Sequence, residues 1–129
     1  MICYVESSAA VKLLVQEAES DALAAHLDER AGEHTIMSCL LVETELRRFA
    51  VRVGVSQEAV SAVLAGITLL EPDRALYRTA GLLPGPHMRS LDALHVAAAL
   101  QLQADVMLTY DHRQAEAARW SGLSTASPR

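Results

Sequence analysis

Four acidic residues at widely separated points of this chain are candidates for one metal-binding cluster. Glu6, Asp92 and Asp111 each stand where a strand-like run meets a helix-like run or in a helix opening, and Glu45 lies within a helical run. Scattered carboxylates that a fold gathers around a hard cation are typical of metal-assisted phosphoester chemistry. Because no cysteine and histidine residues have zinc-type spacing, we expect Mg²⁺ or Mn²⁺ rather than zinc.

Each acid also has a purely structural explanation. The chain contains 16 acidic residues, and most residues of this kind are solvated surface groups. At a helix start, Glu6 and Asp92 would complement the helix dipole, and Asp111 would act as a turn or N-cap residue. The functional interpretation is favoured because all three occupy strand-to-helix switch positions.

The composition indicates one α/β domain over residues 1–129. A chain of this length can bury a core without disulfides, and a composition with 51% hydrophobic but only 4% aromatic residues suits helices packed on a small sheet. The net charge of −5 argues against a simple RNA-binding module, since such modules are usually basic. It argues less against an enzyme, because bound divalent metal reverses the local field that a phosphate meets.

The two cysteines and the first residues of the chain indicate a cytoplasmic protein. Cys3 and Cys39 both lie in apolar runs, which is typical of buried free thiols in a reducing compartment. The chain starts with an acidic segment that lacks the basic region of a signal peptide, and no apolar run is long enough to span a membrane. We therefore expect no membrane association.

Strand-like and helix-like runs alternate along the chain. Apolar runs predict strands at 2–5, 35–37, 67–70, 106–108 and 124–126. Helical runs are predicted at 9–15, 17–31, 39–52, 56–65, 72–81, 91–102 and 111–121, with Ser7 or Ser8, Ser38 and Ser90 among the caps. This alternation predicts a parallel sheet covered by helices on both faces, with a site beyond the carboxyl ends of the strands.

Three stretches resemble the motifs of one nuclease family. Residues 4–14, YVESSAAVKLL, resemble the opening of PIN-domain ribonucleases, in which a strand leads to an acid, hydroxyl residues and a helix. Residues 89–99, RSLDALHVAAA, resemble the third motif of the VapC-type toxins in this family, and residues 104–111, ADVMLTYD, resemble the fourth. The motifs occur in the family's order and cover nearly the whole chain.

The resemblance implies a fold, an activity and partners. The fold would be a PIN-like α/β/α sandwich with a four- to five-stranded parallel sheet. The activity would be that of an Mg²⁺- or Mn²⁺-dependent endoribonuclease, the toxin of a type II toxin–antitoxin pair, which cleaves RNA phosphodiester bonds by metal-activated water. The partners would be an RNA such as tRNA or rRNA, a VapB-type antitoxin and a second copy of the chain in a homodimer. With so few aromatic residues, base stacking is not expected to be the main mode of RNA binding.

The resemblance also assigns roles to individual residues. Four acids would be catalytic, and three of them would bind metal. Two hydroxyl residues would orient the acids, and an arginine before the third motif would contact phosphate or else be an ordinary surface residue. These residues are the catalytic acids Glu6, Glu45, Asp92 and Asp111; the metal ligands Glu6, Asp92 and Asp111; the supporting residues Ser8 and Thr109; and the phosphate contact Arg89.

Two glutamates compete for the second acid position. Glu43 and Glu45 are two residues apart on one predicted helix, which places their side chains about 200° apart, so both cannot face one site. The family pattern puts the acid about seven residues after a serine and just before Leu and Arg, and Glu45 fits that pattern better with Ser38 as the serine. We therefore assign Glu45 to the site and Glu43 to the outer face of the helix.

Two alternatives stay open. His95 lies three residues after Asp92 on nearly the same helix face, and it is either a catalytic base or, by default, a packing histidine with satisfied ring nitrogens. The whole chain is either an active nuclease or a catalytically weak PIN-fold protein that acts through antitoxin or RNA binding. Glu6 keeps the second alternative open, since the family normally has aspartate at that position.

The additional methylene of Glu6 has a testable consequence. Mg²⁺ tolerates poor geometry badly, and a glutamate reaches farther and has more rotamers to fix than an aspartate. We therefore expect lower activity or an altered metal preference, which Glu6→Asp should reverse in an Mg²⁺ titration of the cleavage rate against the unaltered protein. Equal metal affinity and equal rate in the two proteins would show that the methylene is irrelevant.

Overall fold

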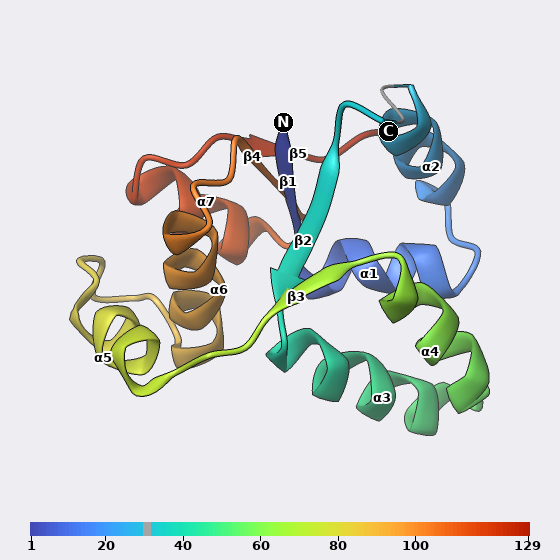
Figure 1. Cartoon of the computed structure of the whole chain (residues 1–129), viewed down its shortest axis with the longest axis horizontal. Helices are drawn as coiled ribbons and strands as arrows, with labels where there is room; N and C mark the ends of the chain where they lie inside the picture. The colour runs from blue at the N-terminus through green and yellow to red at the C-terminus, as the bar shows by residue number, and fades with distance from the viewer. Residues whose placement is uncertain (30–31) are drawn as a thin grey trace.

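The chain folds around a parallel five-stranded sheet (Figure 1). The structure is a computed structural model, and it describes residues 1–29 and 32–129. The strands lie in the order β3-β2-β1-β4-β5, and every neighbouring pair is parallel, which confirms the prediction for the sheet. Their bounds are β1 (Ile2–Val5), β2 (Thr35–Cys39), β3 (Thr68–Leu70), β4 (Val106–Leu108) and β5 (Thr125–Ala126).

Helices cover both faces of the sheet, as the alternating pattern predicts. Figure 1 shows α1 to α4 on one side of the sheet and α5, α6 and α7 on the other, which makes an α/β/α sandwich. The helices of the described ranges are α1 (Ser7–Leu14), α2 (Ser20–Asp28), α3 (Leu41–Val53), α4 (Gln57–Ala65), α5 (Arg74–Leu82), α6 (Ser90–Gln101) and α7 (His112–Trp120).

Each face of the sheet carries its own hydrophobic cluster. Because side chains alternate along a strand, Tyr4 of β1 joins the cluster under α5, α6 and α7, and Cys3 and Val5 join the cluster under α1 to α4. α6 contributes a run of small buried side chains, Ala97 to Ala99, to the first cluster. These small residues let α6 lie close to the sheet, and the ring of Tyr4 is therefore directed toward α6.

The prediction that Ser38 and Ser90 cap helices is wrong. Ser38 lies within β2, and its buried hydroxyl donates a hydrogen bond to Val5 O at 2.6 Å. The hydroxyl thus joins two strands instead of a helix end, and α3 begins after Leu40 without a side-chain cap. Ser90 is the first residue of α6 itself, and Arg89 occupies the N-cap position.

The second predicted helix begins later than expected. α2 begins at Ser20 rather than at Glu17, because the Ser20 hydroxyl accepts a hydrogen bond from Glu17 N at 2.9 Å and donates one to Val15 O at 3.1 Å. These bonds close a turn over the residues that precede the helix. The predicted helix end at Ala31 lies outside the described residues.

The strand order creates a switch point at the centre of the sheet. β1 has β2 on one side and β4 on the other, so the connections that follow β1 and β4 leave the same edge of the sheet. In open α/β sheets, ligands bind in the crevice outside the carboxyl ends of strands at such a point. Within residues 1–29 and 32–129, no helix is long and apolar enough to cross a membrane.

Candidate functional site

Glu6 lies at the carboxyl end of β1 and caps α1 in place of the predicted Ser7 or Ser8. Its Oε2 accepts a hydrogen bond from the backbone N–H of Ser8 at 3.1 Å. The same oxygen accepts hydrogen bonds from the hydroxyls of Ser8 at 2.5 Å and Thr109 at 2.6 Å. The residue is only 5% exposed. Three donors on one oxygen fix the orientation of this carboxylate, and a helix N-terminus is a favourable place for its negative charge.

The Ser8 and Thr109 hydroxyls connect the ends of β1 and β4. Each hydroxyl has one hydrogen, which it gives to Glu6, so each can only accept from its other neighbours. Ser8 Oγ accepts from the backbone N–H of Tyr110 at 2.8 Å, and Thr109 Oγ1 accepts from that of Asp111 at 3.2 Å. The two hydroxyls therefore hold the segment that carries Asp111 against the segment that carries Glu6.

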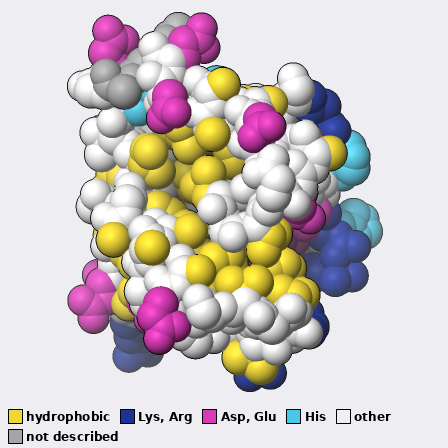
Figure 2. All heavy atoms as spheres, turned by 90° about the vertical axis from the view of Figure 1, so that its right-hand side faces the viewer, with side chains coloured by type: hydrophobic (Ala, Val, Ile, Leu, Met, Phe, Trp, Pro, Cys, Tyr) yellow, Lys and Arg dark blue, Asp and Glu magenta, His cyan; other side chains and the backbone are white. Residues whose placement is uncertain are grey.

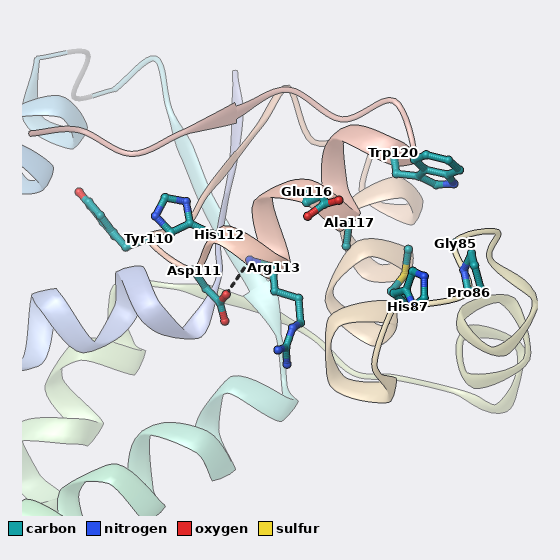
Figure 3. A pocket seen from close by; sticks show the side chains of 11 residues that line it. Gly85, Pro86, His87, Tyr110, Asp111, His112, Arg113, Glu116, Ala117 and Trp120 are labelled. Carbon is teal, nitrogen blue, oxygen red and sulfur yellow. Dashed lines mark hydrogen bonds between the residues drawn. The ribbon is translucent and has the colours of Figure 1, made fainter.

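Asp111 is the N-cap of α7. Its Oδ1 accepts hydrogen bonds from the backbone N–H groups of Arg113 at 2.9 Å and Gln114 at 3.4 Å; Figure 3 shows the first of these. The side chain of Gln114 is buried, and its amide donates to Asp92 O at 3.2 Å. The start of α7 is thereby tied to the first turn of α6, which brings the two aspartates to one place.

Asp92, in the first turn of α6, is the acid whose negative charge is least compensated by hydrogen-bond donors. Its Oδ2 is buried and has no hydrogen-bond partner among the described residues. Loss of hydration raises the pKa of Asp92, and the negative charge of nearby Asp111 adds to that shift, while backbone hydrogen bonding at Arg89 opposes it. A buried acid oxygen without a donor is a position where a cation would be stabilised.

Glu45, on α3, is held by a buried chain of hydrogen bonds. Its Oε1 lies 2.8 Å from His95 Nε2, and the other ring nitrogen of His95, Nδ1, lies 2.6 Å from the Tyr4 hydroxyl. His95 is 1% exposed, and the Ser7 hydroxyl also approaches its Nε2, at 3.2 Å. The histidine therefore packs in the core with both ring nitrogens engaged, and one of them fixes a carboxylate.

If His95 is neutral, the hydrogen bonds of Tyr4 favour one tautomer of its ring. The Tyr4 oxygen accepts a hydrogen bond from Cys39 N at 3.2 Å, so its own hydrogen is free to be donated to His95 Nδ1. Burial raises the pKa of the Tyr4 phenol well above its ordinary value, which keeps that hydrogen in place. Nδ1 is then an acceptor, and Nε2 carries the hydrogen that is donated to Glu45.

Glu43 faces away from this arrangement. Its carboxylate forms an ion pair with Arg47 Nε at 2.9 Å, one turn further along α3. The helical separation of Glu43 from Glu45 therefore places only Glu45 beside His95.

The four acids line one cavity of about 420 Å³ at the carboxyl edge of the sheet, which we call the acid pocket. Glu6, Glu45, Asp92 and Asp111 come from the starts of α1, α6 and α7 and from within α3. The predicted phosphate contact, Arg89, also lines the pocket. The remaining lining residues are Ser90, Leu91, His95, Arg113 and Gln114.

Arg113 is the pocket residue that the sequence analysis missed. It is the second residue of α7, two positions after the N-cap Asp111, and it lines the acid pocket. The signal that could have found it is its position two residues after the last motif acid, where a helix start directs side chains toward the edge of the sheet. With Arg89 it gives the pocket two cationic side chains.

The carboxylates are spread around the acid pocket rather than tightly clustered. Within the part of the chain that the structure describes, no three acid, histidine or cysteine side chains are placed to hold a metal ion together. The donor set nevertheless suits Mg²⁺ or Mn²⁺, because these ions prefer oxygen ligands, keep several waters and need only one or two carboxylates. The buried, unpaired Asp92 Oδ2 beside Asp111 is the feature that fits such an ion.

The sequence matches the PIN domain family over residues 3–119. The chain is a PIN-domain protein. It is 44% identical over 133 residues to Ribonuclease VapC35 of Mycobacterium tuberculosis strain CDC 1551, a match that covers 97% of this chain and 96% of the relative. It is 38% identical over 128 residues to Ribonuclease VapC46 of strain H37Rv, with the same coverage. The chain therefore belongs to the VapC ribonuclease family, which confirms the family that its motifs indicate.

Solved structures with the same fold support the PIN-like architecture. VapBC2 from Rickettsia felis, solved with a DNA fragment from its promoter, aligns with a TM-score of 0.75 and 16% identity over 100% of both chains. VapC20 from Mycobacterium tuberculosis, a sarcin-ricin loop cleaving toxin, aligns with a TM-score of 0.71 and 15% identity over 89% of this PIN domain and 94% of that chain. At these identities the likeness establishes the fold alone.

The hydrogen bonds that link Tyr4, His95 and Glu45 predict the effect of removing the Tyr4 hydroxyl on stability. In Tyr4→Phe, His95 Nδ1 and Cys39 N–H lose their partner, and we expect the free energy of unfolding of the PIN domain to fall by about 1–3 kcal/mol. Urea denaturation measures this change. ¹⁵N NMR of the unaltered protein should show the His95 hydrogen on Nε2.

The control is Tyr77→Phe, because Tyr77 is 55% exposed, lies on α5 and is not one of these hydrogen-bonded residues. Its free energy of unfolding should be nearly unchanged. A hydrogen on Nδ1, or equal stability losses in the two variants, would contradict the proposed order of donors and acceptors.

Asp92→Asn should make the metal-free PIN domain more stable at neutral pH. Because burial raises the folded-state pKa of Asp92, the carboxylate destabilises the folded state once it is ionised. Below the unfolded-state value the acid is protonated in both states and the variant has no advantage. As the pH rises through the raised folded-state pKa, the melting temperature of the unaltered protein should fall relative to that of Asp92→Asn.

Adding Mn²⁺ should reverse this order, since an ion bound only by the folded state stabilises it by mass action. The melting temperature of the unaltered protein should rise with Mn²⁺ concentration and that of Asp92→Asn should not. A Mn²⁺ response of equal size in both proteins would remove Asp92 from the metal site.

Proposed function

We propose that this member of the VapC ribonuclease family is an Mg²⁺- or Mn²⁺-dependent endoribonuclease that acts as the toxin of a type II toxin–antitoxin pair. One observation carries the proposal: four acids from separate elements line a single pocket at the switch point of the sheet. The relatives named ribonucleases, which match over nearly their full length, support the reaction class.

The metal would be held directly by Asp92 and Asp111, with Glu6 as the third ligand through a bound water, because no three acids of the described residues are placed to hold an ion together. Asp92 contributes a buried oxygen without a partner, and Asp111 keeps Oδ2 free of the helix-capping bonds that engage Oδ1. Oε2 of Glu6 is fully engaged by three donors, which leaves Oε1 for an ion or its waters. A bound ion of this kind supplies Lewis acidity and lowers the pKa of a coordinated water.

Glu45 would accept the proton of the attacking water. His95 Nε2–H binds one of its oxygens and fixes the side chain, while the other oxygen stays available toward the acid pocket. In this scheme His95 is a positioning residue rather than the base, because both its ring nitrogens are engaged by protein groups. A correctly placed carboxylate base contributes roughly 10²- to 10⁴-fold to such a step.

Arg89 and Arg113 would bind the phosphates of the RNA. Both side chains line the acid pocket, so they place positive charge where a phosphodiester would approach four carboxylates. The net charge of the whole chain, −5, therefore does not describe the field at the site. An RNA loop that presents a single strand fits this small opening better than a duplex, since specific recognition usually targets unpaired segments.

A VapB-type antitoxin is the proposed protein partner. Two solved relatives of the same fold are VapBC complexes, from Rickettsia felis and nontypeable Haemophilus influenzae. Figure 2 shows hydrophobic side chains gathered on the face bordered by α1, α2 and α4, where Val11, Leu14 and Val63 are only partly buried. An antitoxin segment that folds on binding would cover such an apolar face.

We further propose that residues 1–129 act as one PIN domain, in a cytoplasmic homodimer. The five strands belong to one sheet, and Cys3 and Cys39 are buried in separate hydrophobic clusters with no disulfide between them, which suits a reducing compartment. Large hydrophobic side chains that are exposed in a single copy and lie outside the acid pocket support self-association, among them Val51 and Val53 of α3 and Leu82 of α5.

The pair Glu45 and Glu43 gives a matched test of the activity. Glu45→Gln should lower the rate of Mn²⁺-dependent cleavage of an RNA pool by about 100-fold or more, because an amide cannot accept the proton. Glu43→Gln, on the same helix but paired with Arg47, should leave that rate unchanged. A gel assay of end-labelled RNA measures both.

Asp92→Asn and a chelator should each abolish the cleavage. A loss in Glu43→Gln with none in Glu45→Gln would move the second acid to the other glutamate. An unaltered protein that binds RNA or antitoxin but leaves RNA intact in Mn²⁺ would instead select the catalytically weak binding protein.

A further inference from the structure

A second cavity opens beside the acid pocket. It has a volume of about 960 Å³ and lies between α7 and the loop at 83–88 (Figure 3). We call it the Trp120 groove, after the exposed tryptophan at its far end. Its volume is at the upper end of the range for ligand sites. The reaction scheme above leaves this groove without a role.

The Trp120 groove is continuous with the acid pocket. Asp111 and Arg113 line both cavities. A polymer with one phosphate in the acid pocket would therefore pass Arg113 and place its adjoining unit in the groove. The continuity of the two cavities therefore favours a polymer over a small molecule, which would occupy one cavity alone.

One face of α7 forms the wall of the groove. Arg113, Ala117 and Trp120 follow one another at spacings of four and three residues, so they share this face (Figure 3). The helix rises about 10 Å between the first and the last of them. Ala117 is small and buried, which leaves room beside the indole, while the exposed Glu116 also lines the groove between the cation and the aromatic ring.

The loop at 83–88 holds the indole ring at its edge. Gly85 has φ = +108°, and a Cβ atom at this position would lie 3.4 Å from Trp120 Cδ1 and 3.3 Å from Met88 Cε. The backbone of the loop therefore packs directly against the indole. Trp120 is nevertheless 66% exposed. A ring that is supported on one edge and open to solvent loses little freedom when a flat ligand stacks on it.

We propose that the Trp120 groove binds an unpaired nucleobase of the RNA next to the scissile phosphate, with the base stacked on Trp120 and the intervening phosphate near Arg113. This inference rests on the proposed nuclease function and specifies how its substrate is held. The low aromatic content of the chain argues against stacking as the main binding mode, but one platform beside the site is enough to select single-stranded RNA.

The chemistry of the groove favours RNA over a protein segment. Besides Arg113, the exposed histidines His87 and His112 line it, and an imidazole ring can donate a hydrogen bond to a phosphate or a base edge. Asp111 and Glu116 also line the groove, so it suits a base with one adjoining phosphate rather than several phosphates. The apolar face of Figure 2 lies on the opposite side of the molecule from α7 and offers a peptide more hydrophobic contact. Stacking also tolerates any base, as every base has a flat face.

The single tryptophan of the chain provides a direct test by fluorescence. Glu45→Gln protein in Mn²⁺, which keeps the proposed metal ligands and should bind RNA while cleaving it about 100-fold or more slowly, is titrated with a short oligoadenylate and with an abasic ribose-phosphate oligomer of the same length. The oligoadenylate should quench the Trp120 emission in a saturable way. The abasic oligomer has the same charge but no bases, so it should leave the emission unchanged and bind about 5- to 150-fold more weakly.

Substitution of Trp120 tests the same contact through kinetics. Trp120→Ala should raise the KM for cleavage of single-stranded RNA by about 5- to 150-fold with kcat nearly unchanged, and Trp120→Phe should restore most of the loss. Tyr77→Ala, which removes another exposed aromatic ring on α5, should leave KM unchanged. Thermal unfolding of each variant establishes that it is folded before its KM is compared.

Several outcomes would overturn the proposal. Equal quenching by the two oligomers would mean that only the backbone is bound, and a shift in sedimentation of Trp120→Ala would assign the indole to the homodimer interface. Emission that responds to the antitoxin but not to RNA would assign the groove to that partner. If the unaltered protein cleaves RNA but the oligoadenylate does not quench the Trp120 emission of the variant, the proposed base site is wrong and the nuclease function stands. If the oligoadenylate quenches this emission but the unaltered protein cleaves no RNA, the nuclease function is wrong and the base site stands.

Discussion

The need to provide hydrogen-bond donors for four carboxylates around one pocket is the constraint around which the carboxyl edge of the sheet is arranged. The structure satisfies most of their oxygens separately: hydroxyls and an N–H bind Glu6, helix N–H groups bind Asp111, and His95 binds Glu45. Asp92 Oδ2 alone is both buried and without a donor among the described residues. Among the four acids, the unmet need for a donor is thereby confined to this one oxygen, which is where binding a cation would be most favourable.

The parallel topology is what makes this arrangement possible. Each crossover helix begins near the carboxyl edge from which its strand leaves, so α1 and α7 direct their N-termini at the same place as α6. Three N-terminal helix dipoles then face the acids and favour their negative charge. Glu6 and Asp111 use backbone N–H groups of their helices directly, as caps. The fold thus stabilises an anionic pocket before any ion is bound.

The sequence was sufficient for the order of strands and helices and for gathering the acids at one edge, because both follow from local patterns and from parallel topology. The sequence was insufficient where a side chain forms a hydrogen bond with a residue far away in the chain. Ser38 looks like a helix cap, but its hydroxyl binds Val5 O across the sheet. The contact of Tyr4 with His95 joins residues 91 positions apart and depends on which face of β1 the tyrosine takes, which no local pattern encodes. Arg113 had no motif to mark it.

The distribution of charge limits how this protein can bind RNA. In the part of the chain that the structure describes, only Arg89 and Arg113 line the acid pocket as permanent cations, so few phosphates are neutralised and few counterions are released on binding. Nonspecific electrostatic attraction is correspondingly weak for a chain with a net charge of −5. Affinity must then come from short-range contacts at the site: an ion between the acids and the scissile phosphate, and a flat surface for a base beside it. That requirement links the acid pocket to the Trp120 groove, since Arg113 stands between them and belongs to both.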